Sequence, residues 1–193
     1  MSKSGADQIR EIANLALGDA LNIVQLTALL EGQNAGGVNK RLSDAGADNA
    51  AITARNAMIA YLVVLISRAY ADPKPGDLHL RVAADLLKSD TLARSIFNAG
   101  DASKKVAEFE AQWAACRGDY RLQRINHFRD KFTAHLGEPK DIPVPLYREL
   151  FAFGDATVKA IELLALAIGV ADKPIESNID AVLSANAFWK PWK

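Results

Sequence analysis

The sequence has little of several residue types that would point to particular folds or sites. It contains one cysteine, Cys116, which excludes an internal disulfide and a cysteine-based metal cluster. Aromatic residues make up 7% of its 193 residues, fewer than we expect in the core of a β-sandwich. No phosphate-binding Gly-rich loop follows a strand pattern, and His79 has no companion ligand. We therefore expect neither a metal nor a cofactor.

Two further absences concern membranes and net charge. The longest apolar run, residues 57–66, is shorter than the ~20 residues that cross a bilayer, and the N-terminus lacks the apolar core of a signal peptide. Lys plus Arg and Asp plus Glu both number 23, so the formal net charge is zero. A protein that coats nucleic acid usually has a basic balance. These features predict a soluble cytoplasmic protein without membrane contact, in which any RNA contact is local.

What the sequence does contain is helical periodicity. Apolar residues recur at steps of three and four over residues 6–32 and 48–71. The second segment is apolar nearly all round, which predicts that it lies deepest in the core. Two short helices over 78–88 and 90–98 follow a Pro-rich stop, and residues 40–46 form a loop or a short helix. Two more long helices are predicted, one from Ala102 towards His135 and one over 145–170.

Four long helices joined by short breaks predict a single all-α domain over residues 1–193, arranged as an up-down helical bundle. The short helices and a C-terminal aromatic tail complete it. Its core covers about residues 5–170 and its tail residues 171–193. Trp189 and Trp192 in the tail are expected to pack on the domain or on a partner.

The candidate site lies late in the predicted helix that runs towards His135. Arg129 falls on a stripe with Leu122, Ile125, Phe132 and Leu136, and a charge on a semi-buried face needs partners. Arginine presents a forked donor set that suits phosphate oxygens. The guanidinium is therefore a candidate phosphate ligand.

His135 provides the side chain that exchanges protons near neutral pH. In an ideal helix it lies ~120° around and ~9 Å along from Arg129, so the two side chains converge only through a loosened helix end or a second copy of the chain. A neighbouring stripe on the same helix begins with the apolar residues Val106, Phe109, Trp113, Cys116 and Tyr120. Carried forward at the same spacing, it reaches the candidate substrate contacts Arg124, His127 and Lys131.

The string from Arg129 through Asp130 to His135 resembles the signature of the HEPN superfamily, and is similar to its U-type abortive-infection branch. The resemblance covers roughly residues 5–170. It implies a metal-independent endoribonuclease with a composite site in a homodimer, and a toxin of an abortive-infection or toxin–antitoxin system with an antitoxin partner. In that role Arg129 would orient the scissile phosphate, His135 would act as general acid or base, and Asp130 would position neighbouring groups.

The same residues also have plainer interpretations. Arg129 can pair with an acid of the last long helix, such as Glu162 or Asp155, and His135 can cap a helix end. Some members of the superfamily are inactive scaffolds or nucleotide binders. The alternative function is therefore a non-catalytic helical module that binds a nucleotide or a protein partner.

Overall fold

The described part of the chain is all-α. The structure is a computed structural model that describes residues 3–97, 101–130, 145–175 and 178–193, and these residues contain helices without any strand. The helices are α1 (Gly5–Asn34), α2 (Val38–Asp44), α3 (Asp48–Ala69), α4 (Leu80–Ser89), α5 (Thr91–Phe97), α6 (Asp101–Arg117), α7 (Tyr120–Phe128), α8 (Tyr147–Ala167) and α9 (Asn178–Trp189), followed by the 3-10 turn η2 (Lys190–Trp192).

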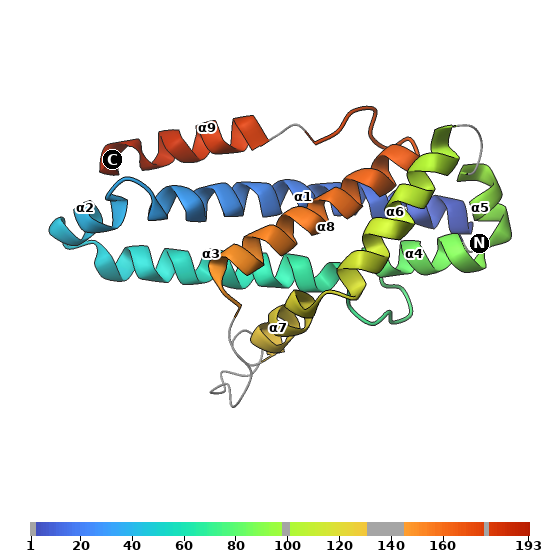
Figure 1. The fold of residues 1–193 in the computed structure, drawn as a ribbon, viewed down its shortest axis with the longest axis horizontal. Coiled ribbons are helices and arrows are strands. Elements are labelled where there is room, and N and C mark those ends of the chain that lie inside the picture. Colours follow the sequence, from blue (N-terminus) through green and yellow to red (C-terminus); the bar gives the residue numbers. More distant parts are fainter. Residues whose placement is uncertain (1–2, 98–100, 131–144, 176–177) are drawn as a thin grey trace.

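Helix α1 is the central element of the fold. It runs beside α3 along the long axis of the molecule, and α9 lies along its other side (Figure 1). Helix α8 crosses α1 obliquely and also packs against α6 (Figure 1). Gly154 of α8 makes the close crossing possible, because a Cβ there would lie 3.3 Å from Ile23 and 3.6 Å from Ile66. The main core thus forms where α1, α3 and α8 meet.

The prediction that residues 48–71 lie deepest is wrong. The buried residues of α3 are confined to its C-terminal part, from Leu62 onwards. Its N-terminal half is largely open to solvent, as at Ile52, which is 44% exposed, and Tyr61 directly before Leu62 is still 49% exposed. The helices with the most buried side chains are α1 and α8. An all-round apolar stretch marks a buried helix only when neighbouring helices are long enough to cover it.

The predicted continuous helix from Ala102 towards His135 is interrupted. It ends at Arg117, and α7 begins after Gly118 and Asp119, where the Asp119 carboxylate accepts a hydrogen bond from the Arg121 amide at 2.8 Å. Because the helix restarts there, Tyr120 leaves the apolar stripe and is 59% exposed. The earlier members of that stripe are buried as predicted: Val106, Phe109, Trp113 and Cys116.

The C-terminal segment contains a helix that the sequence did not predict. Helix α9 packs along α1, and its Trp189 is buried beside Val38 and Leu42. The Trp189 indole donates a hydrogen bond to the Leu29 carbonyl at 2.9 Å. Its ring lies so close to Gly32 that a Cβ there would stand 2.7 Å from Cδ1.

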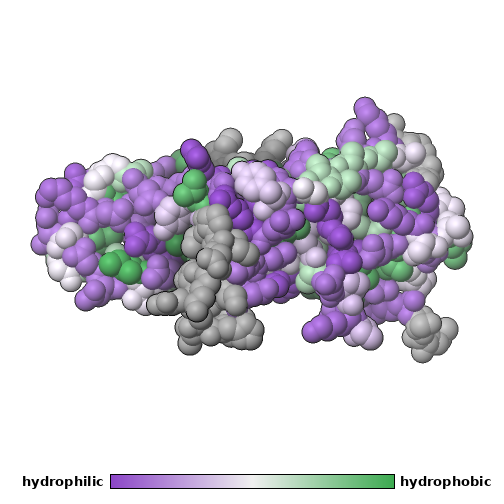
Figure 2. All heavy atoms as spheres, turned by 60° about the horizontal axis from the view of Figure 1, so that its bottom comes forward, coloured by the Kyte–Doolittle hydropathy of each residue, from purple (hydrophilic) through white to green (hydrophobic). Residues whose placement is uncertain are grey.

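Two helices, Gly5–Asn34 and Asp48–Ala69, are long and apolar enough to cross a membrane by length and composition. This is weak evidence, because a core helix of a soluble protein passes the same test; 50% of the α1 stretch and 28% of the α3 stretch are buried within the fold. Figure 2 shows the molecule with the lower side of Figure 1 turned forward. This face is mostly hydrophilic and carries separate hydrophobic patches. The prediction of a cytoplasmic location stays a prediction.

Candidate functional site: a basic pocket around Arg129

Arg129 lies at the end of α7, where the backbone widens. Residues 120–128 are α-helical, and Arg129 and Asp130 follow in a π-helical turn. Leu122 and Ile125, which share the predicted stripe, are buried, whereas the Arg129 side chain is 32% exposed. The stripe therefore brings the base of Arg129 against the core and leaves its guanidinium within reach of solvent.

The Arg129 guanidinium pairs with its neighbour in sequence, Asp130. Its Nε and Nη2 lie 2.8 and 2.7 Å from the Asp130 Oδ1. Neither Glu162 nor Asp155, the acids considered as core partners, lines the pocket of Arg129. Glu162 accepts from the Lys159 ammonium at 2.6 Å and from the Ile175 amide at 2.7 Å. Asp155 faces a different hollow, and burial raises the pKa of its carboxyl.

Arg129 lines a pocket of about 520 Å³, here called the Arg129 pocket. Residues from four parts of the chain surround it, namely the segment after α3, α4, the end of α6, and α7. Its lining residues are Tyr70, Ala71, Asp72, Lys74, Arg81, Arg117, Leu122, Gln123, Asn126 and Arg129. Four of them are basic and one is acidic, so the pocket is positive although the whole chain is neutral.

The basic residues of the pocket differ in how far they are neutralised. Arg81 forms an ion pair with Asp72, and its Nε lies 3.8 Å from the Asp85 Oδ2. The Arg117 guanidinium lies over the Trp113 ring, 5.9 Å from its centroid, and forms no ion pair with a carboxylate of the described residues. Lys74 makes no ion pair with any described residue. The pocket can therefore bind an anion through Lys74 and Arg117, beside Arg129.

Arg124 and His127, the candidate substrate contacts on α7, do not line this pocket. Arg124 donates from Nη1 to both carboxylate oxygens of Glu149, at 2.7 and 2.8 Å. Glu149 also accepts from the Leu146 amide at 2.9 Å, and this bond, aided by the nearby arginines, lowers the pKa of its carboxyl. His127 does not line the pocket, and its Nε2 has no hydrogen-bond partner among the described residues. Lys131 and His135 lie outside the described residues.

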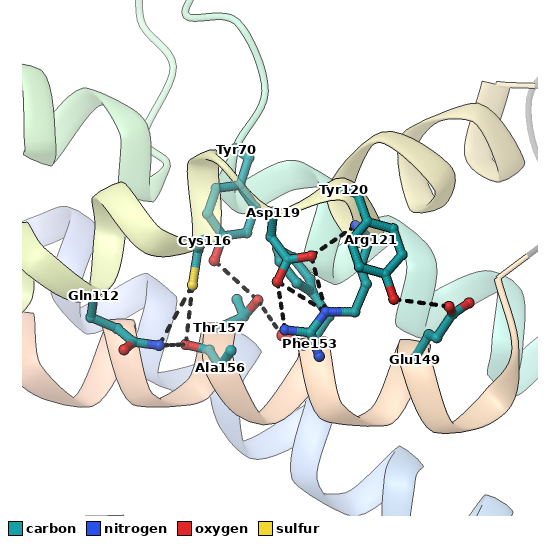
Figure 3. Close-up of polar contacts among 10 residues, drawn as sticks. All are labelled: Tyr70, Gln112, Cys116, Asp119, Tyr120, Arg121, Glu149, Phe153, Ala156 and Thr157. Atoms are coloured by element: carbon teal, nitrogen blue, oxygen red, sulfur yellow. Dashed lines mark hydrogen bonds and ion pairs between the residues drawn. The ribbon is translucent and has the colours of Figure 1, made fainter.

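A buried polar network lies behind the Arg129 pocket (Figure 3). The Tyr70 hydroxyl, at the pocket wall, is 3.1 Å from the Thr157 hydroxyl of α8. The Gln112 amide donates to the Ala156 carbonyl at 3.0 Å, and the Cys116 thiol lies 3.7 Å from the same oxygen. Burial raises the pKa of both Tyr70 and Cys116, so both stay protonated near neutral pH. The network joins α3, α6 and α8 beneath the site.

Asp119 and Arg121 fix the joint between α6 and α7. The Arg121 guanidinium donates to both Asp119 oxygens, with its Nη2 2.5 Å from Oδ2 (Figure 3). These bonds lower the pKa of the Asp119 carboxyl, which stays ionised at neutral pH. The carboxylate thus caps α7 and holds Arg121 at the same time. The direction in which α7 carries Arg129 depends on this pair.

Sequence reasoning found Arg129 but missed its basic neighbours. Lys74 lies between two prolines after α3, Arg81 is in the first turn of α4, and Arg117 is the last residue of α6. Each stands at a helix end or in a loop, where functional residues often lie. Nothing in their spacing shows that they face one another, because their juxtaposition arises only from the packing of separate helices.

Comparison with protein-family models, with curated proteins and with solved structures finds no match to this chain. Among the described residues, no group of three or more His, Cys, Asp or Glu side chains could hold a metal ion. The interpretation of the site therefore rests on its own residues.

Proposed function

We propose that the chain is a metal-independent endoribonuclease of HEPN type that binds RNA at the Arg129 pocket. The observation that carries the proposal is the gathering of Lys74, Arg81 and Arg117 around Arg129 in a chain of zero net charge. Phosphate contacts supply most of the affinity of a protein for RNA, and a local cluster of basic residues provides them without an overall basic charge.

In the proposed mechanism Arg129 binds the scissile phosphate and stabilises the charge that develops on its oxygens. Its bonds to Asp130 hold the guanidinium plane in a fixed direction. His135 takes a proton from the ribose 2′-hydroxyl or returns one to the leaving oxygen. The attack of the 2′-oxygen on phosphorus releases the 5′-oxygen and leaves a cyclic phosphate. Lys74 and Arg117 hold the neighbouring phosphates.

The proposed setting of this activity follows the HEPN resemblance. The protein is a cytoplasmic homodimer whose composite site draws on both chains, and it acts as the toxin of an abortive-infection or toxin–antitoxin system with an antitoxin partner. Its fold is an up-down bundle of the long helices, in one domain over residues 1–193 with the aromatic tail docked on it. Two observations support this proposal. The Arg129 pocket is lined by four basic residues, and the described residues form helices without any strand.

The direct test is cleavage of a 5′-labelled single-stranded RNA by the purified protein in excess EDTA. We expect product ending in a cyclic phosphate, and a loss of 100-fold or more, on the order of 3 kcal/mol in the activation barrier, in Arg129→Ala. His135→Ala is expected to lose about 10²- to 10⁴-fold. Arg41→Ala, which removes an exposed arginine of α2, serves as the matched control. Equal rates in wild type and Arg129→Ala would remove the basis of the proposal.

A second candidate function is a nucleotide-binding module without catalysis. It is favoured by the lining of the Arg129 pocket, which contains basic, amide and phenol groups but no histidine among the described residues. Its pocket volume suits one nucleotide. The two functions separate in cells: a toxin slows growth when expressed alone and His135→Ala removes the effect, whereas a binding module does neither.

A further inference from the structure

A second pocket lies at the start of α7. Its volume is about 510 Å³, and it is lined by Gly118, Asp119, Tyr120, Arg121, Arg148 and Glu149. We call it the Tyr120 pocket. Neither the HEPN resemblance nor the proposed cleavage site assigns a role to it.

Tyr120 presents a fixed aromatic ring to this pocket. The ring is 59% exposed, yet its hydroxyl donates to the Glu149 carboxylate at 3.2 Å (Figure 3). The Arg124 guanidinium lies 5.7 Å from the ring centroid and is itself held by Glu149. Tyr120 lines the pocket and Arg124 does not. An exposed ring held this way offers a stacking surface at little entropic cost.

The pocket also contains an uncommitted cation. Arg121 is bound to Asp119, and Glu149 is bound to Arg124. The guanidinium of Arg148 makes no salt bridge or hydrogen bond within the described residues. A free guanidinium beside a fixed aromatic ring is the pair of groups that binds a base and the phosphate next to it in single-stranded nucleic acid.

The two pockets meet at the joint between α6 and α7. Arg117 lines the Arg129 pocket and Gly118 lines the Tyr120 pocket. Because these residues are consecutive in the chain, their Cα atoms are ~3.8 Å apart. Both residues are exposed. A Cβ at Gly118 would make only ordinary contacts, at 3.6 and 3.8 Å from the Ala114 and Ala115 carbonyls. The helix packing therefore leaves room for a side chain at Gly118, and such a side chain would stand at the joint between the two pockets.

We propose that the Tyr120 pocket is a second RNA-binding site, in which an unpaired base stacks on Tyr120 and Arg148 binds the adjacent phosphate. The strand crosses the joint at Gly118 and continues into the Arg129 pocket. This inference rests on the proposed function, since it takes RNA as the ligand. Stacking needs a base that is not paired in a helix, so the site selects single-stranded RNA.

Binding of a labelled 2′-O-methyl octanucleotide, which lacks the attacking hydroxyl, tests the second site by fluorescence anisotropy. Tyr120→Ala should weaken binding by about 5- to 100-fold, whereas Tyr120→Phe keeps the ring and most of the affinity. Arg148→Ala should weaken binding and reduce the slope of log K against log salt by about one. Tyr61→Ala, which removes a similarly exposed tyrosine of α3, should bind as wild type does.

Two further arms separate this site from the cleavage site. A dinucleotide is too short to occupy both pockets at once, so Tyr120→Ala and Arg129→Ala should each weaken its binding less than they weaken octanucleotide binding. Gly118→Leu should weaken octanucleotide binding, whereas Gly18→Leu on the exposed side of α1 should not. Wild-type affinity of Tyr120→Ala for the octanucleotide would overturn the second site alone. Failure of Arg129→Ala to weaken either ligand would overturn the proposed cleavage site, and no RNA binding by wild type would overturn both.

Discussion

His79 is a buried side chain with unsatisfied hydrogen-bonding groups. It precedes α4, is 8% exposed, and neither ring nitrogen has a hydrogen-bond partner among the described residues. The Asp77 carboxylate is 3.6 Å from Nε2, beyond hydrogen-bond range. Burial lowers the pKa of His79, and the charge of Arg81 adds to this effect, while Asp77 and Asp85 oppose it. The residue is therefore neutral in the fold at pH 7.

The lowered pKa of His79 predicts a loss of stability in mild acid. Because the folded state binds the proton more weakly than the unfolded state, the free energy of unfolding falls as pH drops below 6.5. His79→Leu should remove this fall and gain about 1 kcal/mol at pH 7, since no unsatisfied polar group stays buried. Urea denaturation at pH 7.5 and 5.5 measures both effects. A parallel decline in wild type and variant between these pH values would contradict the account.

At the residue scale the sequence predicted part of the candidate site. Arg129 was identifiable because its spacing in the sequence places it on the same helical stripe as Leu122 and Ile125, which are buried. Lys74 and Arg117 could not be placed beside it. They are distant in sequence, and only the packing of the segment after α3 against α6 and α7 brings them to one pocket.

At the scale of elements, periodicity located the helices better than it located their ends. The predicted ranges for α1, α3, α4 and α8 agree with the structure within a few residues. The break at Gly118 was missed because the apolar spacing of α6 continues in register through Tyr120. The signal there was local: a glycine followed by Asp119, whose carboxylate caps the new helix.

Burial was harder to predict than helicity. The apolar character of α3 suggested a core position, but half of that helix extends beyond the elements that could cover it. Helix α9 was missed for the opposite reason. Its buried residues Ala181, Ala185 and Trp189 form a narrow stripe, and apolar side chains such as Leu183 and Phe188 remain exposed, which blurs the pattern.

Two glycines of α1 form a matched pair that tests the docking of α9. A Cβ at Gly18 would have nothing within 4 Å of it, so Gly18→Ala should stabilise the protein by about 0.5–1 kcal/mol through helix propensity. At Gly32 the same methyl would stand 2.7 Å from Trp189, whose ring is buried and hydrogen-bonded. Gly32→Ala should therefore destabilise by about 1–3 kcal/mol despite the same gain in propensity.

Thermal unfolding of the two variants, together with tryptophan fluorescence, measures this difference. In Gly32→Ala the Trp189 emission should shift towards that of a solvent-exposed indole, while Gly18→Ala keeps the wild-type spectrum. Stabilisation of both variants by similar amounts would mean that the end of α9 is not held against α1 in solution.

At the scale of the whole molecule, charge is separated although its sum is zero. The Arg129 pocket is lined by four basic residues and one acidic residue, whereas the lining of the Tyr120 pocket balances Arg121 and Arg148 against Asp119 and Glu149. Asp119 at the start of α7 and Glu149 at the start of α8 each accept a backbone hydrogen bond and pair with an arginine. A neutral chain can thus present a basic pocket, and the salt dependence of RNA binding should reflect that pocket rather than the net charge.

The last prediction concerns the number of chains in the proposed cleavage site. Arg129 and His135 lie six positions apart in sequence, a spacing that places them on different sides of a regular helix. The proposed homodimer resolves this by pairing Arg129 of one chain with His135 of the other. Arg129→Ala and His135→Ala proteins should then each be inactive alone and regain activity when co-expressed as heterodimers.

In such a heterodimer one of the two composite sites keeps both functional residues, so a purified heterodimer should show about half of the wild-type rate. Different affinity tags on the two variants allow its isolation, and cleavage of labelled RNA in EDTA measures the rate. A dimer of Arg129→Ala with itself under the second tag is the control and should stay inactive. Absence of recovery in a heterodimer that forms and binds RNA would mean that each chain holds a complete site, because a shared site cannot stay inactive when one intact pair is present.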